Sequence, residues 1–191
     1  NVGIAPLDVG QFPKLEAVLD VIYNPARTKL LQDAMARGVR AVNGLEMLVA
    51  QAQKSAEIWT GVPMERQKTE EILRLLRGQM ENIVLVGMPG CGKSTLGKMV
   101  AVKTKRNFYD ADDELEQYYQ MKITDIFNKH GEDAFRQMET ETIQRLSLLH
   151  NSIIATGGGA VTRSINMEIA KKNDLVVFID RPVKSILSDI V

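Results

Sequence analysis

The stretch that most constrains the fold is a glycine-rich run at residues 87–94, Gly-Met-Pro-Gly-Cys-Gly-Lys-Ser. The apolar, β-branched run before it, residues 82–86, predicts a buried strand. Residues 95–102 predict a helix whose apolar face carries Leu96, Met99 and Val100. A strand, a glycine loop and a helix in this order attract anions, because backbone N–H groups and the helix N-terminus both face the loop. We therefore expect a binding site for the phosphates of a nucleotide.

The spacing G-x-x-x-x-G-K-[ST] also assigns roles within this loop. Lys93 is expected to reach the β/γ-phosphates, and the Ser94 hydroxyl is expected to ligate Mg²⁺. A chance match in an ordinary βα turn is the alternative, but the complete pattern and both flanking elements are present. The further residues expected to contact the nucleotide are Gly87, Gly90, Cys91, Gly92 and Thr95.

Bulk composition excludes several classes of partner. The 191 residues contain 24 basic and 24 acidic side chains, so no net charge recruits nucleic acid or an anionic membrane. No apolar run approaches the roughly 18 residues of a membrane span. The single cysteine, Cys91, rules out an internal disulfide and fits a reducing compartment, so we expect a cytoplasmic protein. We interpret Cys91 as a small residue tolerated in the loop rather than as a reactive thiol.

Residues 1–61 predict a strand–helix–strand–helix alternation, which is half of a doubly wound, Rossmann-type sheet. The expected strands are residues 17–23 and 39–42, and the expected helices run from Pro25, capped by Asn24, to Gly38 and over residues 45–59 up to Gly61. The apolar stripe of the second helix is Leu45, Leu48, Val49, Ala52, Ala56 and Trp59. The charged residues 62–81 predict a linker helix between two modules.

Residues 82–191 predict a second α/β module. Further strands are expected at residues 108–109, 152–156 and 175–179. Helices are expected at residues 113–119, from Thr124 to Gly131, at residues 132–150 and from Pro182 onward.

Two carboxylates, Asp110 and Asp112, follow the strand at residues 108–109. If that strand lies beside the strand of the phosphate loop, both face the crevice in which α/β sheets bind ligands. One could order Mg²⁺ near Ser94 while the other accepts a hydrogen bond from a substrate hydroxyl. Capping of the next helix by Asp112 and Asp113 explains the spacing equally well.

Arg136 lies near the start of the long helix, with Glu139 one turn later to hold its guanidinium. A planar fork of donors suits a carboxylate substrate, although a solvated surface charge is the plainer alternative. Gly157, Gly158 and Gly159 follow a buried strand, so they form either a close approach to a ligand or a mobile turn.

Together these motifs resemble shikimate kinase: residues 87–97, Phe-Tyr-Asp-Ala-Asp-Asp-Glu-Leu-Glu, Ile-Phe-x-x-x-Gly-Glu-x-x-Phe-Arg-x-x-Glu and Ala-Thr-Gly-Gly-Gly-Ala. The resemblance covers residues 82–191 and implies a P-loop NTPase fold of the nucleoside-monophosphate-kinase type, with a parallel sheet. It implies that Lys93 and Ser94 serve ATP and Mg²⁺, that Asp110 supports the metal, and that Asp112 bonds the attacking 3-hydroxyl of shikimate. It assigns the substrate to Arg136 and residues 157–159, and the ring pocket to Phe127 and Phe135, both of which also fit a plain core.

One part of the family pattern is missing. The family carries a mobile lid with an Arg-Pro-Leu-Leu type motif and a further substrate arginine beyond it. Arg181-Pro182 directly follows an expected strand, too early in the chain to be this lid. We expect the lid, the second arginine and the adenine-binding loop to follow Val191.

Residues 1–61 resemble the C-terminal part of shikimate dehydrogenase, through Asp20-Val-Ile-Tyr-Asn-Pro, Asn43-Gly-Leu-Glu-Met-Leu-Val-Ala-Gln-Ala and Trp59-Thr-Gly. The resemblance implies that Tyr23 and Gln51 touch shikimate and that Val21 and Gly44 lie beside NADP. Physical reasoning alone makes Tyr23 and Gln51 ordinary boundary residues. The catalytic lysine–aspartate pair and the dinucleotide loop of that family are expected before Asn1.

These resemblances predict part of a bifunctional enzyme of the shikimate pathway, a dehydrogenase followed by a kinase, that uses ATP with Mg²⁺ and, in its intact dehydrogenase part, NADP. Two alternatives stay open. One is another small-metabolite kinase with the same loop, such as a gluconate kinase. The other is a fragment that binds nucleotide without turnover.

Overall fold

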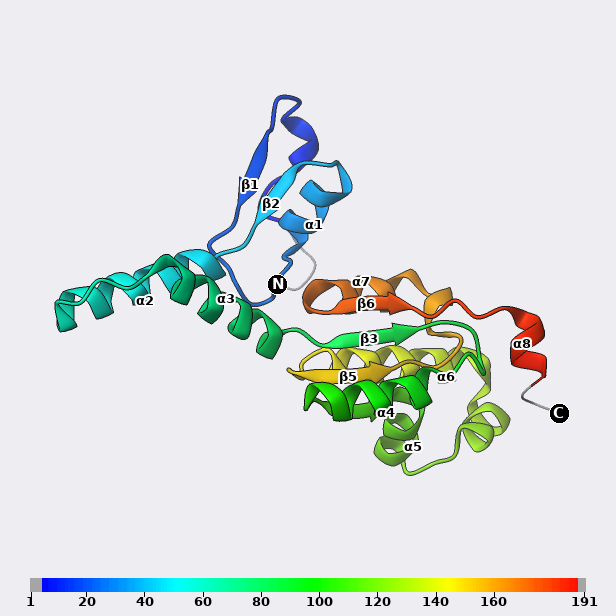
Figure 1. Cartoon of the computed structure of the whole chain (residues 1–191). Coiled ribbons are helices and arrows are strands. Elements are labelled where there is room, and N and C mark those ends of the chain that lie inside the picture. Colours follow the sequence, from blue (N-terminus) through cyan, green and yellow to red (C-terminus); the bar gives the residue numbers. More distant parts are fainter. Residues whose placement is uncertain (1–4, 189–191) are drawn as a thin grey trace. The chain divides into compact units, whose positions relative to one another are not determined.

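The computed structural model describes residues 5–188, which divide into two units, Asn1–Gln79 and Met80–Val191 (Figure 1). None of the helices formed by these residues has the length and apolar character needed to span a lipid bilayer. The expected helix after Pro182 is α8, Val183–Leu187, and residues 189–191 lie outside the described part.

In the first unit, a short 3₁₀ turn, η1 (Val9–Gln11), precedes strand β1 (Ala17–Leu19), helix α1 (Lys29–Ala36) and strand β2 (Arg40–Val42). The two strands pair in parallel, with Val18 opposite Ala41, as a crossover helix between them requires. The core of this unit is Val9, Val18, Leu31 and Ala34.

Helix α1 begins four residues later than expected from Asn24-Pro25, and β1 ends before residues 20–23. The hydroxyl of Thr28 accepts the Leu31 N–H and donates to the Asp20 carboxylate at 2.7 Å. Thr28 is therefore the cap, because its side chain satisfies a backbone N–H of the first turn that has no partner within the helix. Gly38, with φ of 72°, ends the helix as predicted.

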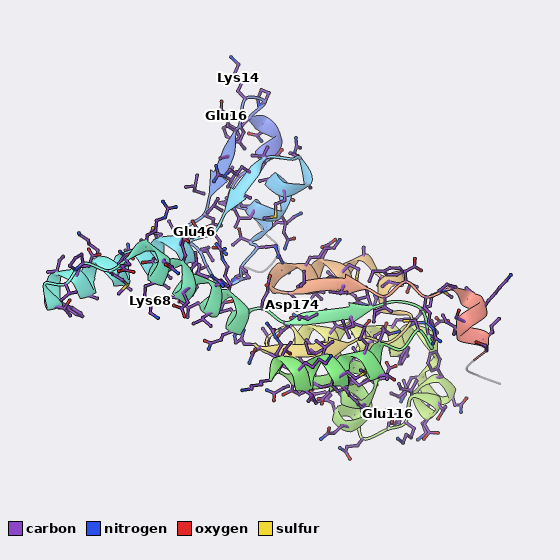
Figure 2. All side chains as sticks on the ribbon, viewed as in Figure 1. Lys14, Glu16, Glu46, Lys68, Glu116 and Asp174 are labelled. Atoms are coloured by element: carbon purple, nitrogen blue, oxygen red, sulfur yellow. The ribbon has the colours of Figure 1, made fainter. Side chains whose placement is uncertain are left out.

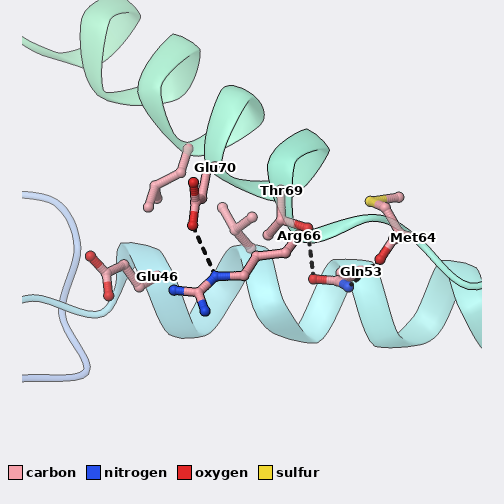
Figure 3. Close-up of a pocket in the computed structure, with 8 residues that line it drawn as sticks. Glu46, Gln53, Met64, Arg66, Thr69 and Glu70 are labelled. Carbon is pink, nitrogen blue, oxygen red and sulfur yellow. Dashed lines mark hydrogen bonds and ion pairs between the residues drawn. The ribbon is translucent and has the colours of Figure 1, made fainter.

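Helices α2 (Leu45–Thr60) and α3 (Arg66–Met80) complete the first unit. Gly61 ends α2 in the left-handed conformation, as predicted. Side chains join the two helices: Thr69 donates to Gln53 at 2.8 Å, and Arg77 pairs with Glu46 at 2.6 Å. The helix expected to act only as a linker is thus bound to α2, and a shallow cavity of about 420 Å³ lies between them (Figure 3).

The apolar stripe predicted for α2 is only partly buried. Leu45 and Val49 are buried, but Trp59 is 85% exposed and Leu48 is also exposed. The spacing placed these residues on one stripe, but within the described part of the first unit only some of them are buried.

The second unit is built on a parallel sheet of four strands: β4 (Asn107–Asp110), β5 (Ser152–Ala155), β3 (Ile83–Val86) and β6 (Leu175–Phe178), in that order. Every residue of β5 is buried, as expected for an inner strand covered by helices on both faces. The helices are α4 (Lys93–Thr104), α5 (Ala111–Tyr119), α6 (Ile123–Leu146), α7 (Ser164–Asn173) and α8, with a 3₁₀ turn, η2 (Ala160–Thr162), before α7.

Helix α4 packs on the sheet through a face that includes Val100 but not the other two residues predicted for it. Gly97 and Ala101 are buried, whereas Leu96 is 41% and Met99 is 56% exposed. A β-carbon on Gly97 would come within 2.5 Å of the Phe108 ring, so the absence of a side chain lets the helix lie close to the sheet. The apolar pattern alone pointed to the larger residues and missed this small-residue contact.

Helix α6 contains the break that was predicted at Gly131, where φ is 79° and ψ is 177°. Its first segment begins at Ile123 after Lys122, one residue before the expected Thr124. Its second segment ends at Leu146 rather than His150, because the Leu149 carbonyl accepts a hydrogen bond from the buried Asn82 side chain. Helix α7 was not predicted, because Asn166 is completely buried among its apolar positions and hides their spacing.

The side chain of Asn82 ties together the starts of three strands. Its amide oxygen accepts the Ser152 N–H at 3.0 Å, and its amide nitrogen donates to Asp174 at 2.9 Å and to the Leu149 carbonyl at 2.7 Å. Asp174 lies at the start of β6 (Figure 2). These bonds fix the register at this edge of the sheet, and the site lies at the other edge, where the strands end.

Candidate functional site

The loop of residues 87–92 connects β3 to α4, as predicted from the sequence. Gly90 and Gly92 have φ of 74° and 94°, a region in which a side chain would be strained. Lys93 is buried at the first position of α4, and its ammonium donates to the carbonyls of Gly87 and Met88 at 2.9 and 2.8 Å. The loop carbonyls therefore hold the Lys93 side chain against the loop. This happens at the N-terminus of a helix, where anions are favoured.

The other loop residues that we expect to contact the nucleotide differ in how deeply they are buried. Cys91 is buried, with its sulfur 3.8 Å from the Lys93 ammonium, and Thr95 is exposed on the first turn of α4. A β-carbon on Gly87 would meet the Cys91 sulfur and the Ile179 carbonyl, so Gly87 also makes room within the loop. Cys91 is thus a buried residue packed closely against Gly87.

Ser94 and Asp110 meet at the carboxyl edge of the sheet, with the serine hydroxyl donating to the aspartate at 2.5 Å. The condition that we considered, β4 beside β3, is not met, since β5 lies between them. The two residues meet nevertheless, because parallel strands end at a common edge. A hydroxyl and a carboxylate are oxygen ligands of the kind that Mg²⁺ prefers. Residues 5–188 contain no group of three or more His, Cys, Asp or Glu side chains that could hold a metal ion.

Asp110 is also the N-cap of α5, where its carboxylate accepts the Asp112 N–H at 3.1 Å. The capping role that we considered for Asp112 and Asp113 therefore belongs to Asp110. Burial, and after it the negative charges of Asp110 and Glu139, together raise the pKa of Asp112 to about 6. A carboxylate with a pKa this close to neutrality can exchange a proton under ordinary conditions.

Arg136 lies on α6 and is held by two carboxylates. Its guanidinium pairs with Glu139 at 3.2 Å and with Glu132 at 3.2 Å, and its side chain is 24% exposed. Glu139 is 2% exposed, and burial raises its pKa while the charge of Arg136 opposes that rise. Arg136 is consequently a partly buried, oriented cation rather than a solvated surface charge.

The three glycines after β5 each make room for a different side chain. A β-carbon on Gly157 would come within 3.0 Å of Asp112, one on Gly158 would strike Pro89, and one on Gly159 would strike the Arg136 guanidinium. The glycine segment thus lies against the phosphate loop, the acidic side chain and the arginine at once. This geometry explains the three glycines by close packing within the protein, and a close approach to a ligand stays a prediction.

The two aromatic residues proposed for a ring pocket stack on each other, with ring centroids 4.5 Å apart. Phe135 is buried with Leu115 and Ile126, so most of its surface belongs to the core. Phe127 is exposed on one side and is the one of the pair that a ligand can reach.

In the first unit the predicted site residues are more open. Val21 is exposed beside Gly44, whose missing side chain leaves room for the Val21 carbonyl. Tyr23 and Gln51 are also exposed, at the loop after β1 and on α2 respectively. The structure brings Val21 and Gly44 together and leaves Tyr23 and Gln51 in the surface setting of ordinary boundary residues.

Arg163 was missed by the sequence reasoning. Its guanidinium donates to the Arg136 carbonyl at 2.8 Å and to the Thr140 hydroxyl at 3.0 Å. Nothing in the sequence marks an arginine 27 positions away as a partner of Arg136, because the contact depends on how η2 returns to α6.

Comparison with known families agrees with this arrangement. The model of the shikimate kinase family matches residues 89–190, more than half of the chain. The model of the shikimate 5'-dehydrogenase C-terminal domain matches residues 44–74, which include α2 and most of α3.

Relatives and solved structures match the second unit. A shikimate kinase of Clostridium botulinum is 48% identical over 108 residues, covering 56% of this chain and 65% of the relative. The chloroplastic shikimate kinase of Solanum lycopersicum is 38% identical over 122 residues, covering 63% of this chain and 40% of the relative. The structure of shikimate kinase from Acinetobacter baumannii in complex with shikimate has a TM-score of 0.57 at 38% identity, covering 60% of this chain and 64% of that one.

The chain thus spans just under two thirds of the length of the bacterial relatives that it matches. The order of the motifs, the parallel sheet around the phosphate loop and the family match all point the same way. This chain belongs to the shikimate kinase family.

Proposed function

We propose that the protein transfers the γ-phosphoryl group of ATP to the 3-hydroxyl of shikimate. The observation that carries this proposal is the convergence of Lys93, Ser94, Asp110, Asp112 and Arg136 on one edge of the sheet, around the glycine segment at residues 157–159. A phosphate-binding loop beside a carboxylate and an oriented arginine suits phosphoryl transfer to a substrate that is itself an acid.

The nucleotide end of the reaction rests on Lys93 and Ser94. When phosphates enter the loop, the Lys93 ammonium exchanges its two carbonyl partners for phosphate oxygens, so no buried charge is left without a partner. Ser94 and Asp110 would hold Mg²⁺, which supplies charge neutralisation for the transferring group. The loop amides and the start of α4 orient the triphosphate for in-line displacement.

At the substrate end, the hydroxyl oxygen attacks the γ-phosphorus while the bond to the β–γ bridging oxygen breaks and ADP leaves. Asp112 accepts the hydroxyl proton in this step. Its pKa of about 6 leaves it largely ionised at neutral pH and still basic enough to take a proton. The Arg136 guanidinium binds the substrate carboxylate, which fixes the hydroxyl beside Asp112.

An assay of ADP release by the longer protein that contains this chain tests the proposal. ADP formation that depends on shikimate and not on gluconate supports it. Turnover with gluconate instead favours the related small-metabolite kinase. Binding of Mg·ATP without turnover of either acid favours a nucleotide-binding protein with no kinase activity.

We also infer that the longer protein joins this kinase to a shikimate dehydrogenase, because the dehydrogenase model matches residues 44–74. The described residues of the first unit do not fit NADP by themselves. The turn between β1 and α1, residues 20–28, has no glycine, so its backbone cannot approach a pyrophosphate closely. Formation of NADPH from shikimate by the longer protein supports the inference, and its absence in an active kinase contradicts it.

A further inference from the structure

The segment that follows the three glycines holds Arg136 at two points. At one end, Gly159 lies directly against the Arg136 guanidinium. At the other end, four residues later, the Arg163 guanidinium donates to the Arg136 backbone carbonyl at 2.8 Å. The same carbonyl accepts the Thr140 hydroxyl at 3.0 Å, and Arg163 donates to that hydroxyl at 3.0 Å. Residues 159–163 therefore contact Arg136 at both its side chain and its backbone.

That stretch is itself tied together. The Thr162 hydroxyl donates to the Gly159 carbonyl at 2.7 Å, and the buried Asn166 amide donates to the Ala160 carbonyl at 3.0 Å. Because both contacts lie within residues 159–166, the distance between the Gly159 contact and the Arg163 contact is held nearly constant. A shift of α6 relative to the glycines would have to break the bonds of Arg163.

We infer that Arg163 is a positioning residue, which sets the place of Arg136 relative to the glycine segment and thereby tunes recognition of an anionic, carboxylate-bearing substrate. The inference rests on the proposed function for the identity of that substrate. Arg163 acts through Arg136, since its guanidinium donates to a backbone carbonyl and a hydroxyl on α6.

The positive charge of Arg163 also helps to keep Arg136 in its orientation. Glu139, the buried partner of Arg136, has its pKa raised by burial, and the positive charges of Arg136 and Arg163 oppose that rise. Keeping Glu139 ionised preserves its pairing with Arg136 at 3.2 Å. The hydrogen bonds of Arg163 to α6 and the effect of its charge on Glu139 thus both link Arg163 to the orientation of Arg136.

Arg163 itself is exposed, so replacing it does not leave a cavity or a buried charge. The 191-residue chain carrying Arg163→Gln is expected to fold. Its NMR spectrum should show the Nε–H signal of Arg136 shifted or broadened, because the guanidinium samples more orientations. By calorimetry, shikimate affinity should fall roughly 10-fold, the scale of one charge-assisted hydrogen bond, while the affinity for Mg·ATP stays the same.

Arg163→Lys provides the conservative comparison, because a single ammonium can still reach the Arg136 carbonyl. It should restore a large part of the shikimate affinity. Lys103→Ala, an exposed cation in the last turn of α4, removes the same charge without touching α6 and should change neither the Arg136 signal nor either affinity.

An unchanged Arg136 signal and an unchanged shikimate affinity in Arg163→Gln would overturn the inference. Equal losses of shikimate and Mg·ATP affinity would also overturn it, because they would indicate a general structural role. If the unmodified chain binds no shikimate, the proposed function fails for this chain. The Arg136 signal then still decides whether Arg163 positions that residue.

Discussion

The two units of this chain differ in whether their motifs meet partners within the same unit. In the second unit, Ser94 finds Asp110 at 2.5 Å, and Gly158 and Gly159 lie against Pro89 and Arg136. In the first unit, Tyr23 and Gln51 have surface settings, and Trp59 is 85% exposed on α2. Both units have parallel strands joined by helices, yet only the second brings the side chains of its predicted site into contact with one another.

This contrast shows when a sequence motif indicates chemistry and when it does not. A resemblance carries chemical meaning when the fold supplies the groups that each residue needs. Asp112 has a raised pKa because the fold buries it and places the charges of Asp110 and Glu139, from other elements, nearby. Gly44, by contrast, is explained by a packing need, the approach of the Val21 carbonyl, which requires no ligand.

The largest effect is expected from two substitutions that should stop catalysis in the second unit without unfolding it. Lys93→Ala and Ser94→Ala, in the longer protein, should each abolish shikimate-dependent ADP release, because both residues act on phosphate or Mg²⁺. Circular dichroism should show intact folding. Lys103→Ala serves as the control and should keep full activity. Wild-type rates in either loop variant would rule out the assignment of the phosphate site.

Asp112→Asn should lower the catalytic rate by roughly 10²-fold, the usual scale for a positioned acid–base group, with little change in Mg·ATP affinity. In the unmodified enzyme kcat/KM should rise with pH through about 6, since Asp112 must be ionised to accept the proton. Normal turnover with weakened ATP binding would mean that Asp112 serves the metal and that the two aspartate roles are exchanged.

The raised pKa of Asp112 should also make the free energy of unfolding depend on pH. The folded pKa of Asp112, about 6, lies above its ordinary value of 3.8, so the folded state holds the proton more firmly than the unfolded chain does. The free energy of unfolding should therefore fall as pH rises from about 4 to about 6. Urea titrations at several pH values should show a smaller fall in Asp112→Asn. A fall of equal size in both proteins would place its cause elsewhere.

These residues also show how far the sequence could be read. The phosphate loop, the break at Gly131 and all four strands of the second unit were predictable, because each depends on a local pattern. The strand order was not, since β5 enters the sheet between β4 and β3 through long-range pairing. Arg163 and the buried face of α4 were missed for the same reason: Gly97 and Arg163 gain their roles from distant Phe108 and Arg136.

Two glycine substitutions, one in each unit, are expected to have effects of intermediate size. Gly158→Ala places a β-carbon against Pro89 and should destabilise the second unit by about 1–3 kcal/mol, the usual scale of overpacking, while weakening kinase activity. Gly78→Ala, in α3, meets no atom within 4 Å and should stabilise its helix by about 0.5–1 kcal/mol. Thermal unfolding measures both. A harmless Gly158→Ala would mean that the loop and the glycine segment are not closely packed.

The smallest expected effect concerns the first unit. Tyr23→Phe and Gln51→Ala should leave the kinase rate of the longer protein unchanged, because both side chains are exposed and belong to the other unit. The 191-residue chain should also form no NADPH from shikimate and NADP⁺, because hydride transfer needs a glycine-rich dinucleotide turn, which the loop at residues 20–28 lacks. The same substitutions should lower NADPH formation in the longer protein if Tyr23 and Gln51 complete a dehydrogenase site there. A slower kinase in either variant would instead show that the two units share a functional surface, and NADPH production by the 191-residue chain would locate the dinucleotide site within it.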